Sequence, residues 1–195
     1  MIRAPMKNAS QKLFSGRTLL AAASIFLVFG GLLYLEGRPA WCKDGLGFWS
    51  AAWRHCTSQH LLDPYSLTHV LHGIIFFWLL QPFASRADLR WRLVGALILE
   101  IGWELLENSP WVIERYRQDT ASLDYTGDSI VNSMGDVVAT IVGFAYASRV
   151  TWKVALVVFV VVELGLAYFV RDNLTLNVFM LFFPSESVKQ WQLHG

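Results

Sequence analysis

The sequence predicts an all-α protein, a polytopic integral membrane helical bundle of about five transmembrane helices that forms one domain over residues 1–195. Composition is the first reason, because 54% of the residues are hydrophobic and nine are Trp. Such a chain is too apolar for an ordinary soluble domain, and Trp is favoured at membrane–water interfaces. The second reason is that five apolar runs approach the length that a tilted helix needs to cross the hydrocarbon core. No repeat divides the chain further.

The first expected helix follows a basic tail of about residues 1–17. Lys7, Lys12 and Arg17 precede the apolar run, as they would in a signal peptide. The run is nevertheless long enough to span, and bulky Trp41 makes a lipoprotein-type cleavage before Cys42 unfavourable. We therefore expect an uncleaved first helix at about residues 18–36.

Four more spanning helices are expected at about residues 67–84, 91–107, 129–148 and 153–170. The third of the five is short unless the arginines before it and the glutamates near its end lie at the two membrane surfaces. A last apolar patch, Leu174–Phe183, is too short to span and is expected at the surface or under the bundle. Residues 36–66 and 108–127 are expected to be loops.

Basic residues of the short connections indicate the orientation. They lie in the N-terminal tail, between the second and third helices, and between the fourth and fifth. In the two connections they are Arg86, Arg90, Arg92, Arg149 and Lys153. A five-helix topology puts these segments on one side, so we place them and the N-terminus in the cytoplasm. The two long loops and the C-terminus then lie outside.

Both cysteines of the chain, Cys42 and Cys56, fall in the first outer loop. An oxidising exterior would let them form a disulfide closing a loop of about 15 residues, which stabilises by about 3 kcal/mol on the chain-entropy estimate. Two free thiols are the alternative. A zinc site with His55 and His60 is a further one, although no paired C-x-x-C is present.

The most informative feature is an excess of acidic residues in a membrane-like stretch. Eight of the fifteen acidic residues lie between Glu100 and Asp136, together with only two bases, Arg115 and Arg117. A carboxylate at the bilayer centre costs roughly 2.5–3.5 kcal/mol on insertion scales, so intramembrane acids usually mark function. The eight are Glu100, Glu104, Glu107, Glu114, Asp119, Asp124, Asp128 and Asp136.

Polar residues at helical spacing share faces of three expected helices. The three sets are Glu100, Glu104 and Glu107; Asp128, Asn132 and Asp136; and His69 with His72. Gly135 and Gly102 lie beside these sets and would allow close helix approach, and Glu163 adds a polar group from the fifth helix. The simplest packing turns the three faces inward around a water-accessible cavity that opens outward.

Three hypotheses account for these groups. They could bind a divalent cation such as Zn or Mn, which accept mixed nitrogen and oxygen ligands; the candidate ligands are His69, His72, Glu104 and Asp128. The carboxylates could instead act directly as acid and base, because crowding in a low dielectric tunes carboxyl groups for proton transfer. Finally, the network could be structural, with Arg115 and Arg117 clamping the acids. The structural hypothesis leaves the acidic excess unexplained.

The segment Tyr116–Asp136 resembles a family of uncharacterised bacterial multi-pass membrane proteins of about this length, known mainly from alphaproteobacteria. The resemblance extends from the helix with His69 and His72 through about Phe144, and includes Trp103-Glu104 and Glu107-Asn108. It implies an inner-membrane protein with an outward-facing polar site, and it supplies no reaction.

That family is similar in pattern to the broader VanZ-like group. The shared mark is an acid-rich helix followed by Arg and then by Asp-x-x-x-Asn-x-x-Gly, which is matched here by Arg117, Asp128, Asn132 and Gly135. The chain departs from VanZ itself in its two histidines, its Trp-rich outer loop and the additional Asp136. Resistance to glycopeptides is therefore not carried over.

We expect a site that acts on an envelope lipid or a lipid-linked sugar, by hydrolysis or group transfer if the protein is an enzyme. The residues expected to carry catalysis are Glu104, Glu107, Arg117 and Asp128, with the arginine as an anion clamp for phosphate. Those expected to bind substrate are Glu100, Asp124, Asn132 and Asp136. His69 and His72 are expected to be metal ligands or proton shuttles.

A non-catalytic scaffold or assembly factor of a membrane complex is the alternative. It is motivated by the aromatic stretch Trp41–Trp53 and by the apolar C-terminal patch. A proton-coupled transporter comes third, because five helices without a repeat do not fit the usual transporter architecture. The net charge of +1 gives no basic excess, so the expected partners are the bilayer and a lipid-linked substrate, and no nucleic acid.

Overall fold

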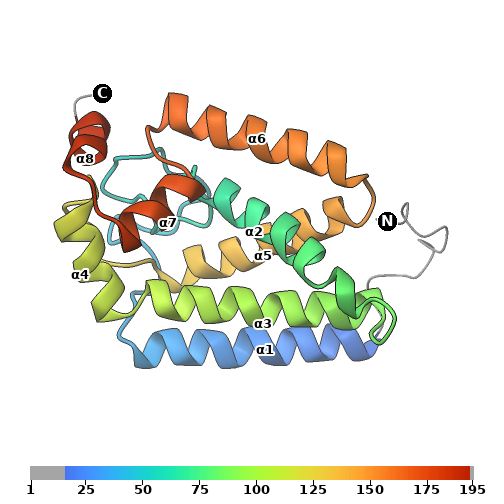
Figure 1. Ribbon diagram of the computed structural model, residues 1–195. Coiled ribbons are helices and arrows are strands. Elements are labelled where there is room, and N and C mark those ends of the chain that lie inside the picture. The colour runs from blue at the N-terminus through green and yellow to red at the C-terminus, as the bar shows by residue number, and fades with distance from the viewer. Residues whose placement is uncertain (1–15, 194–195) are drawn as a thin grey trace.

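A computed structural model describes residues 16–193, and within this range the chain is helical and contains no β-strand (Figure 1). The expected all-α class is confirmed. The tail expected at residues 1–17 falls almost wholly outside the described residues. The elements are α1 (Gly16–Leu35), α2 (Ser66–Leu79), η1 (Gln81–Phe83), α3 (Leu89–Glu107), α4 (Pro110–Asp119), α5 (Ile130–Ala147), α6 (Trp152–Phe169), α7 (Leu174–Phe182) and α8 (Glu186–Leu193).

Five of these helices, α1, α2, α3, α5 and α6, coincide with the five that hydropathy predicts. The second is shorter than expected, because α2 ends at Leu79 and a 3₁₀ turn replaces its last part. Pro82 lies in that turn, and a proline disfavours α-helical backbone at the residue before it. By length and composition, α5 and α6 qualify as membrane spans within the described residues. The expectation of about five spans is thus not confirmed.

Helix α4 lies in a segment that was expected to be a loop. It begins at Ser109, whose hydroxyl accepts from the Val112 amide, and Pro110 occupies the first turn. A serine followed by proline is a recognised helix-start signal, so the sequence did contain the information. Helix α7 covers the apolar patch that was judged too short to span, and it begins at Asn173 by the same kind of cap.

The centre of the bundle is the contact between α2 and α5. A Cβ on Gly73 would lie 2.1 Å from the Thr140 carbonyl oxygen, and one on Gly143 would lie 1.9 Å from that of Val70. The two backbones therefore touch, which only glycine allows. The Thr140 hydroxyl also donates to the His69 carbonyl at 2.9 Å. This contact sets the depth of every side chain on α2 relative to α5.

The other helices surround this pair. Phe29 and Leu33 of α1 pack with Leu97 of α3 and Val137 of α5 in a fully buried apolar cluster. In Figure 1, α1 and α6 lie on opposite sides of the bundle, with α2, α3 and α5 between them. A second apolar cluster, which includes Leu71, fills the space between α2, α3, α5 and α6.

The two ends of the bundle differ in what they carry. Helices α4, α7 and α8 gather at one end with the loop that connects α1 to α2, whereas the α2–α3 and α5–α6 connections lie at the other (Figure 1). This arrangement agrees with the expected division of the loops into two sets. We call the end with α4, α7 and α8 the loop end.

Gly135 approaches a neighbouring segment closely, as expected, because a Cβ there would lie 1.9 Å from the Leu61 carbonyl oxygen. The same expectation for Gly102 is wrong. Nothing lies within 4 Å of a Cβ at that position, since Gly102 is on the exposed face of α3.

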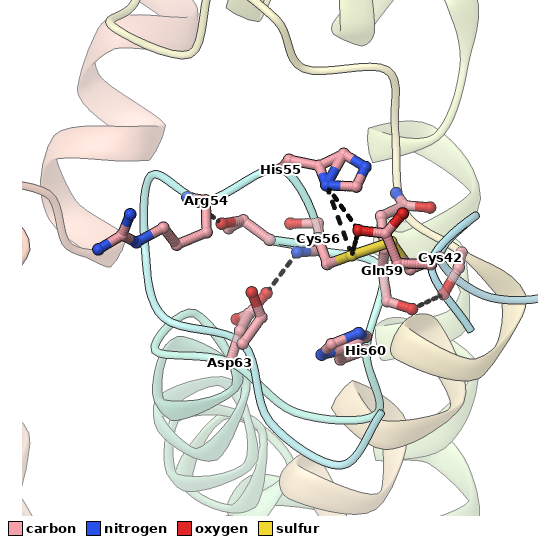
Figure 2. Close-up of a disulfide and its surroundings, with 12 residues drawn as sticks. Cys42, Arg54, His55, Cys56, Gln59, His60 and Asp63 are labelled. Atoms are coloured by element: carbon pink, nitrogen blue, oxygen red, sulfur yellow. Dashed lines mark hydrogen bonds and ion pairs between the residues drawn. A yellow bond between two sulfur atoms is a disulfide. The ribbon is translucent and has the colours of Figure 1, made fainter. Parts of the chain in front are cut away.

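Cys42 and Cys56 form a disulfide at the loop end (Figure 2). The expected pairing is confirmed, and no thiolate remains for the zinc alternative. His60, the second candidate of that alternative, instead has Nδ1 3.0 Å from the Trp49 carbonyl oxygen. Closing a loop of this length stabilises by about 3 kcal/mol. Further hydrogen bonds tie the loop to the segment before α5: Arg38 Nε donates to the Asp128 carbonyl at 3.0 Å and Gln59 Nε2 to that of Gly127 at 2.7 Å.

The α2–α5 contact makes a direct prediction. Gly143→Ala should lower the free energy of unfolding by at least about 2 kcal/mol, because the added methyl group meets backbone that cannot rotate away. Gly102→Ala is the matched control and should be neutral or stabilising by up to about 1 kcal/mol, as expected for a helical glycine in open space. Denaturant titration in detergent measures both. Equal stability of the two variants would contradict the close contact.

Candidate functional site

A cavity of about 410 Å³ lies at the loop end of the bundle. Its volume falls in the range of small-molecule sites, roughly 300–1,000 Å³. The disulfide-closed loop, the segment before α5 and helices α2, α3 and α5 all contribute ionisable groups to its walls. These groups include His69, His72, Glu107, Asp128 and Asp136. The cavity therefore reaches from the loop end into the centre of the bundle.

Two histidines from α2 share one carboxylate from α3. His69 Nδ1 lies 2.5 Å from Glu100 Oε1, and His72 Nδ1 lies 2.9 Å from Glu100 Oε2. Glu100 has no exposed surface, and both histidines are more than nine-tenths buried. A carboxylate accepts hydrogen bonds, so both Nδ1 atoms act as donors and the Nε2 atoms are left as the coordinating or proton-accepting nitrogens.

Two further carboxylates approach His69 from different helices. Glu104 Oε1 of α3 lies 3.3 Å from His69 Nδ1, and Asp136 Oδ2 of α5 lies 3.9 Å from His69 Nε2. Among the described residues, no hydrogen-bond partner exists for either carboxylate oxygen of Glu104 or for Asp136 Oδ1. Each unpaired buried polar group costs about 1–3 kcal/mol, and more when charged. This cost is unusual for native proteins, in which such atoms normally have partners.

Asp128 occupies the wall of the cavity just before α5. Tyr125 donates its hydroxyl to Oδ1 at 2.9 Å and Asn108 donates Nδ2 to Oδ2 at 3.0 Å. Burial raises the pKa of Asp128 above its ordinary value, and the Tyr125 hydrogen bond opposes that rise. The carboxyl group is thus fixed in position and has an enhanced tendency to hold a proton.

Asn108 is a site residue for which the sequence analysis assigned no role. Its Oδ1 accepts from the Asp128 amide at 2.7 Å, while its Nδ2 lies 3.0 Å from the Glu104 carbonyl oxygen. Asn108 thereby joins the end of α3 to the start of α5. Its position directly after the glutamates was the only available signal, and a single asparagine at a helix end is more often a cap.

The structure brings together eight of the ten residues expected at the site. Asn108 Nδ2 donates both to the Glu104 backbone carbonyl and to the Asp128 carboxylate, and both acids are buried. The eight are His69, His72, Glu100, Glu104, Glu107, Asp128, Asn132 and Asp136. Glu107 accepts from the Tyr116 hydroxyl at 3.2 Å, and Asn132 Nδ2 donates to the His60 carbonyl at 2.8 Å.

The remaining two residues lie farther out. Asp124 is exposed at the cavity wall. Arg117 does not contribute to that wall; its Nε donates to the Tyr125 carbonyl at 2.6 Å, and its guanidinium lies 3.8 Å from the exposed Glu114. The catalytic and binding roles of all ten residues stay predictions.

The expected arginine clamp on the buried acids is not formed. Arg115 pairs with Asp119 at 2.8 Å on its own helix, α4, and Arg117 with Glu114 of that helix. Glu163 has a different, structural position: its carboxylate accepts from the Leu174 and Thr175 amides at 3.0 Å each and so caps α7. Within residues 16–193, the basic side chains that contact Glu100, Glu104 and Asp136 are histidines.

A second residue without an expected role, Asp172, lies in the cavity wall between α6 and α7. Burial raises its pKa to about 7, while hydrogen bonds from the Asn173 amide, Tyr65 and Gln192 oppose the rise. The sequence offers no sign of this, since Arg171-Asp172-Asn173 reads as an ordinary polar connection between two apolar helices.

Helical packing around a buried His–carboxylate cluster with an adjoining cavity defines the class: an all-helical protein with an internal ionisable site. Two of its helices are apolar and long enough to cross a membrane, which weakly indicates membrane association. Residues 33–194 match the family described as "Protein of unknown function (DUF2585)".

Curated relatives from several alphaproteobacteria carry the name UPF0314 protein. The one from Brucella anthropi is 44% identical over 178 residues, which cover 91% of each chain. One from Rhizobium etli is 45% identical over 161 residues, covering 82% of this chain and 83% of the relative. One from Sphingopyxis alaskensis is 38% identical over 178 residues, covering 90% and 95%. No solved structure matches the chain. The chain therefore belongs to this family of unknown function.

Asp172 makes stability depend on pH. Its folded-state pKa of about 7 exceeds the ordinary aspartate value, so the folded protein binds the proton more tightly than the unfolded chain does. Its stabilising contribution is complete in acid and is lost as the pH rises towards and through 7. Between pH 5 and pH 8 this loss amounts to roughly 2–3 kcal/mol.

Asp172→Asn cannot ionise and should abolish that part of the pH dependence. Denaturant titrations at several pH values in detergent measure it, with exposed Asp124→Asn as the control that should keep the wild-type slope. An Asp172→Asn slope equal to that of the wild type would refute the assignment.

Proposed function

We propose that this protein is a multi-pass inner-membrane protein whose cavity receives the polar headgroup of an envelope lipid or of a lipid-linked sugar. The observation that carries the proposal is the inverted polarity of the bundle. Many large apolar side chains are exposed on the outer helix faces, whereas several carboxylates and two histidines are buried between the helices. Soluble proteins have the opposite arrangement, and bundles surrounded by lipid have this one.

Helices α3 and α6 illustrate the inversion. Only 17% of α6 is buried, and its Val161 and Leu164 are 62% and 65% exposed. On α3, Ile98 is 60% exposed while Glu100 and Glu104 have no exposed surface. The two glutamates in the middle of α3 therefore face inward, and the outer face beside them is compatible with lipid. This supports a membrane bundle with more spans than α5 and α6 alone.

The disulfide and the basic residues support the same orientation. Disulfides persist in oxidising compartments outside the cytoplasm, and Cys42–Cys56 lies at the loop end. At the other end, Arg86 and Arg149 lie in the connections, and Arg90 and Lys153 lie in the first turns of the helices that follow, as expected for the cytoplasmic side. The proposal accordingly puts the N-terminus in the cytoplasm and the cavity at the outer side.

We assign acid–base roles to Asp128 in the cavity wall and to Glu104, which is fully buried beside the cavity-lining His69. The reaction class is hydrolysis or group transfer, for which a positioned carboxyl group can donate or accept a proton. His69 and His72 would exchange protons with the cavity through the nitrogens that Glu100 leaves free. Arg117 lies near the segment that carries Tyr125 and could contact a phosphate only beyond the present cavity wall.

The likeness to the VanZ-like group is part of the proposal. Its Asp-x-x-x-Asn-x-x-Gly mark corresponds to three residues with distinct positions: Asp128 in the cavity wall, Asn132 bonded to the His60 carbonyl, and Gly135 against Leu61. Such a motif would hold the loop end against α5 and present one carboxyl group to the cavity.

The scaffold or assembly factor remains the second candidate. Trp41, Phe48 and Trp49 are 52%, 70% and 53% exposed on the disulfide-closed loop. An exposed aromatic group of this kind fits a membrane surface and would equally fit a protein partner. A scaffold would use this loop and would not require the chemistry of the buried carboxylates.

Reporter fusions check the orientation. Alkaline phosphatase is active only outside the cytoplasm, so fusion after Ser122 should give active enzyme and fusion after Arg149 should not. Green fluorescent protein fused at the same two positions should give the reverse pattern. Activity of both phosphatase fusions, or of neither, would contradict the five-span topology.

The catalytic roles are tested in a deletion strain complemented with variants. Mass spectrometry of extracted envelope lipids should show a lipid-linked species that accumulates in the deletion strain and disappears with the wild-type gene. Glu104→Gln and Asp128→Asn should leave at least about tenfold more of that species than wild type, as expected for loss of a positioned acid or base.

Glu114→Gln is the control, because Glu114 is an exposed carboxylate on α4. It should restore the wild-type lipid composition. The membrane amount of every variant is measured by immunoblot, so that loss of the protein is not mistaken for loss of chemistry. Normal lipids in both site variants at normal abundance would rule out the proposed chemistry and favour the scaffold.

A further inference from the structure

The acidic centre of the bundle contains a set of groups from three helices at distances typical of a metal site before it is filled. One nitrogen of His69 and one oxygen each of Glu104 and Asp136 lie within 4.8 Å of one another. Ligands about 2.1 Å from one ion lie about 3–4 Å apart. A contraction of about 1 Å would bring the three atoms to the spacing of ligands on one ion.

The unpaired oxygens are independent support for a ligand. Glu104 is fully buried and neither of its carboxylate oxygens has a hydrogen-bond partner among the described residues. Asp136 is 3% exposed, and its Oδ1 also has no hydrogen-bond partner among the described residues. A native fold normally pairs such atoms with protein, water or an ion. Glu104 Oε1 approaches His69 Nδ1 and Asp136 Oδ2 approaches His69 Nε2, and one oxygen of each lies close enough to the other for one bound cation to contact both carboxylates.

The balance of buried charges in the cluster also supports a bound cation. The cluster holds three buried carboxylates, of Glu100, Glu104 and Asp136, against two imidazoles, and within residues 16–193 no Lys or Arg pairs with these acids. Uncompensated buried charge is strongly destabilising. A divalent cation supplies two positive charges at the point where the acids converge.

Glu100 has the position of a carboxylate that orients metal-binding histidines. It holds Nδ1 of both His69 and His72, at 2.5 and 2.9 Å, and so turns their Nε2 atoms away from itself. Ligating histidines usually donate their second ring nitrogen to a carboxylate in this way. His69 Nε2 is then directed to the side where Asp136 Oδ2 lies, 3.9 Å away.

We propose that His69, Glu104 and Asp136 bind one divalent transition-metal ion, with Glu100 as the residue that orients His69. Mixed nitrogen and carboxylate ligands suit Zn²⁺ or Mn²⁺ better than Mg²⁺ or Ca²⁺. His69, His72 and Asp136 border the cavity, so the ion keeps a coordination position for water, for His72 or for a headgroup oxygen. The proposed metal site extends the proposed function. It rests on that function only in taking the cluster to be part of a functional site.

Metal binding is tested on full-length protein purified in detergent through a tag without histidine, stripped with EDTA and dialysed against Zn²⁺ or Mn²⁺. Elemental analysis should give one ion per chain. Asp136→Asn and Glu104→Gln, which keep the side-chain shapes, should weaken binding at least 100-fold in calorimetric titration. Glu100→Gln should weaken it about 10- to 100-fold, as loss of an orienting carboxylate does.

His55→Gln is the matched control, because His55 is an exposed histidine beside the disulfide, near Asp44. It should bind as the wild type does. If a site variant does not fold, wild-type protein with bound Mn²⁺ still provides a test. The electron spin-echo signal of the Mn²⁺ should be modulated by the nitrogen of a coordinating histidine. No ion on the wild type, no nitrogen modulation, unchanged binding in Asp136→Asn, or lost binding in His55→Gln would each overturn the site.

The metal-binding test and the lipid test can each fail while the other succeeds. An ion bound by these residues, in cells whose lipids do not respond to Glu104→Gln, would sustain the metal site and reject the proposed chemistry. Altered lipids with no bound ion would reject the metal site and sustain direct acid–base catalysis by the carboxyl groups.

Discussion

The backbone contact between α2 and α5 is the constraint on which the rest of the structure depends. Gly73 and Gly143 leave no room for a side chain between the two helices, and the Thr140 hydroxyl holds the His69 carbonyl across the same contact. Because the helices touch, His69 on α2 comes within 3.9 Å of Asp136 on α5. Helix α3 then closes the third side with Glu100 and Glu104. The ionisable centre is thus a consequence of how closely two helices can approach.

The same centre would be very costly if its groups were unpaired in lipid. Glu100 offsets part of that cost by accepting from two histidines, and Asn108 and Tyr125 satisfy Asp128. Glu104 and Asp136 keep buried oxygens without partners among the described residues. The polar network is therefore satisfied at Glu100 and Asp128 and incomplete at Glu104 and Asp136. Natural proteins tolerate such incompleteness chiefly where a ligand, an ion or a reaction uses it.

Much of the architecture could be predicted because hydropathy is a local property. The five apolar runs of the sequence correspond to five helices of the structure. The i, i+4 spacing of the acids of α3 correctly predicted that they share one face. The short helices were harder: α4 has a polar composition and was recognisable only by Ser109-Pro110, while α8 (Glu186–Leu193) carries no apolar run. Gly102 shows the limit of reading residues singly, since whether a glycine marks a contact depends on which face of its helix another helix covers. Asn108 and Asp172 become part of the site through hydrogen bonds to residues 20 or more positions away in the chain.

By itself, the sequence determined the helical class, the main helix positions and the set of acids and histidines from which a site could be made, and it offered the pairing of the two cysteines as one of three alternatives. These follow from composition and from spacing along one helix. Only the tertiary structure decided which of those groups meet, because that depends on the depth and rotation of one helix against another. It put Glu100 between two histidines and left oxygens of Glu104 and Asp136 near His69 without hydrogen-bond partners among the described residues. It also directed Arg115 and Arg117 to partners on their own short helix or beside it. Distances between helices decide the electrostatics of a buried site, and the order of residues along the chain does not contain those distances explicitly.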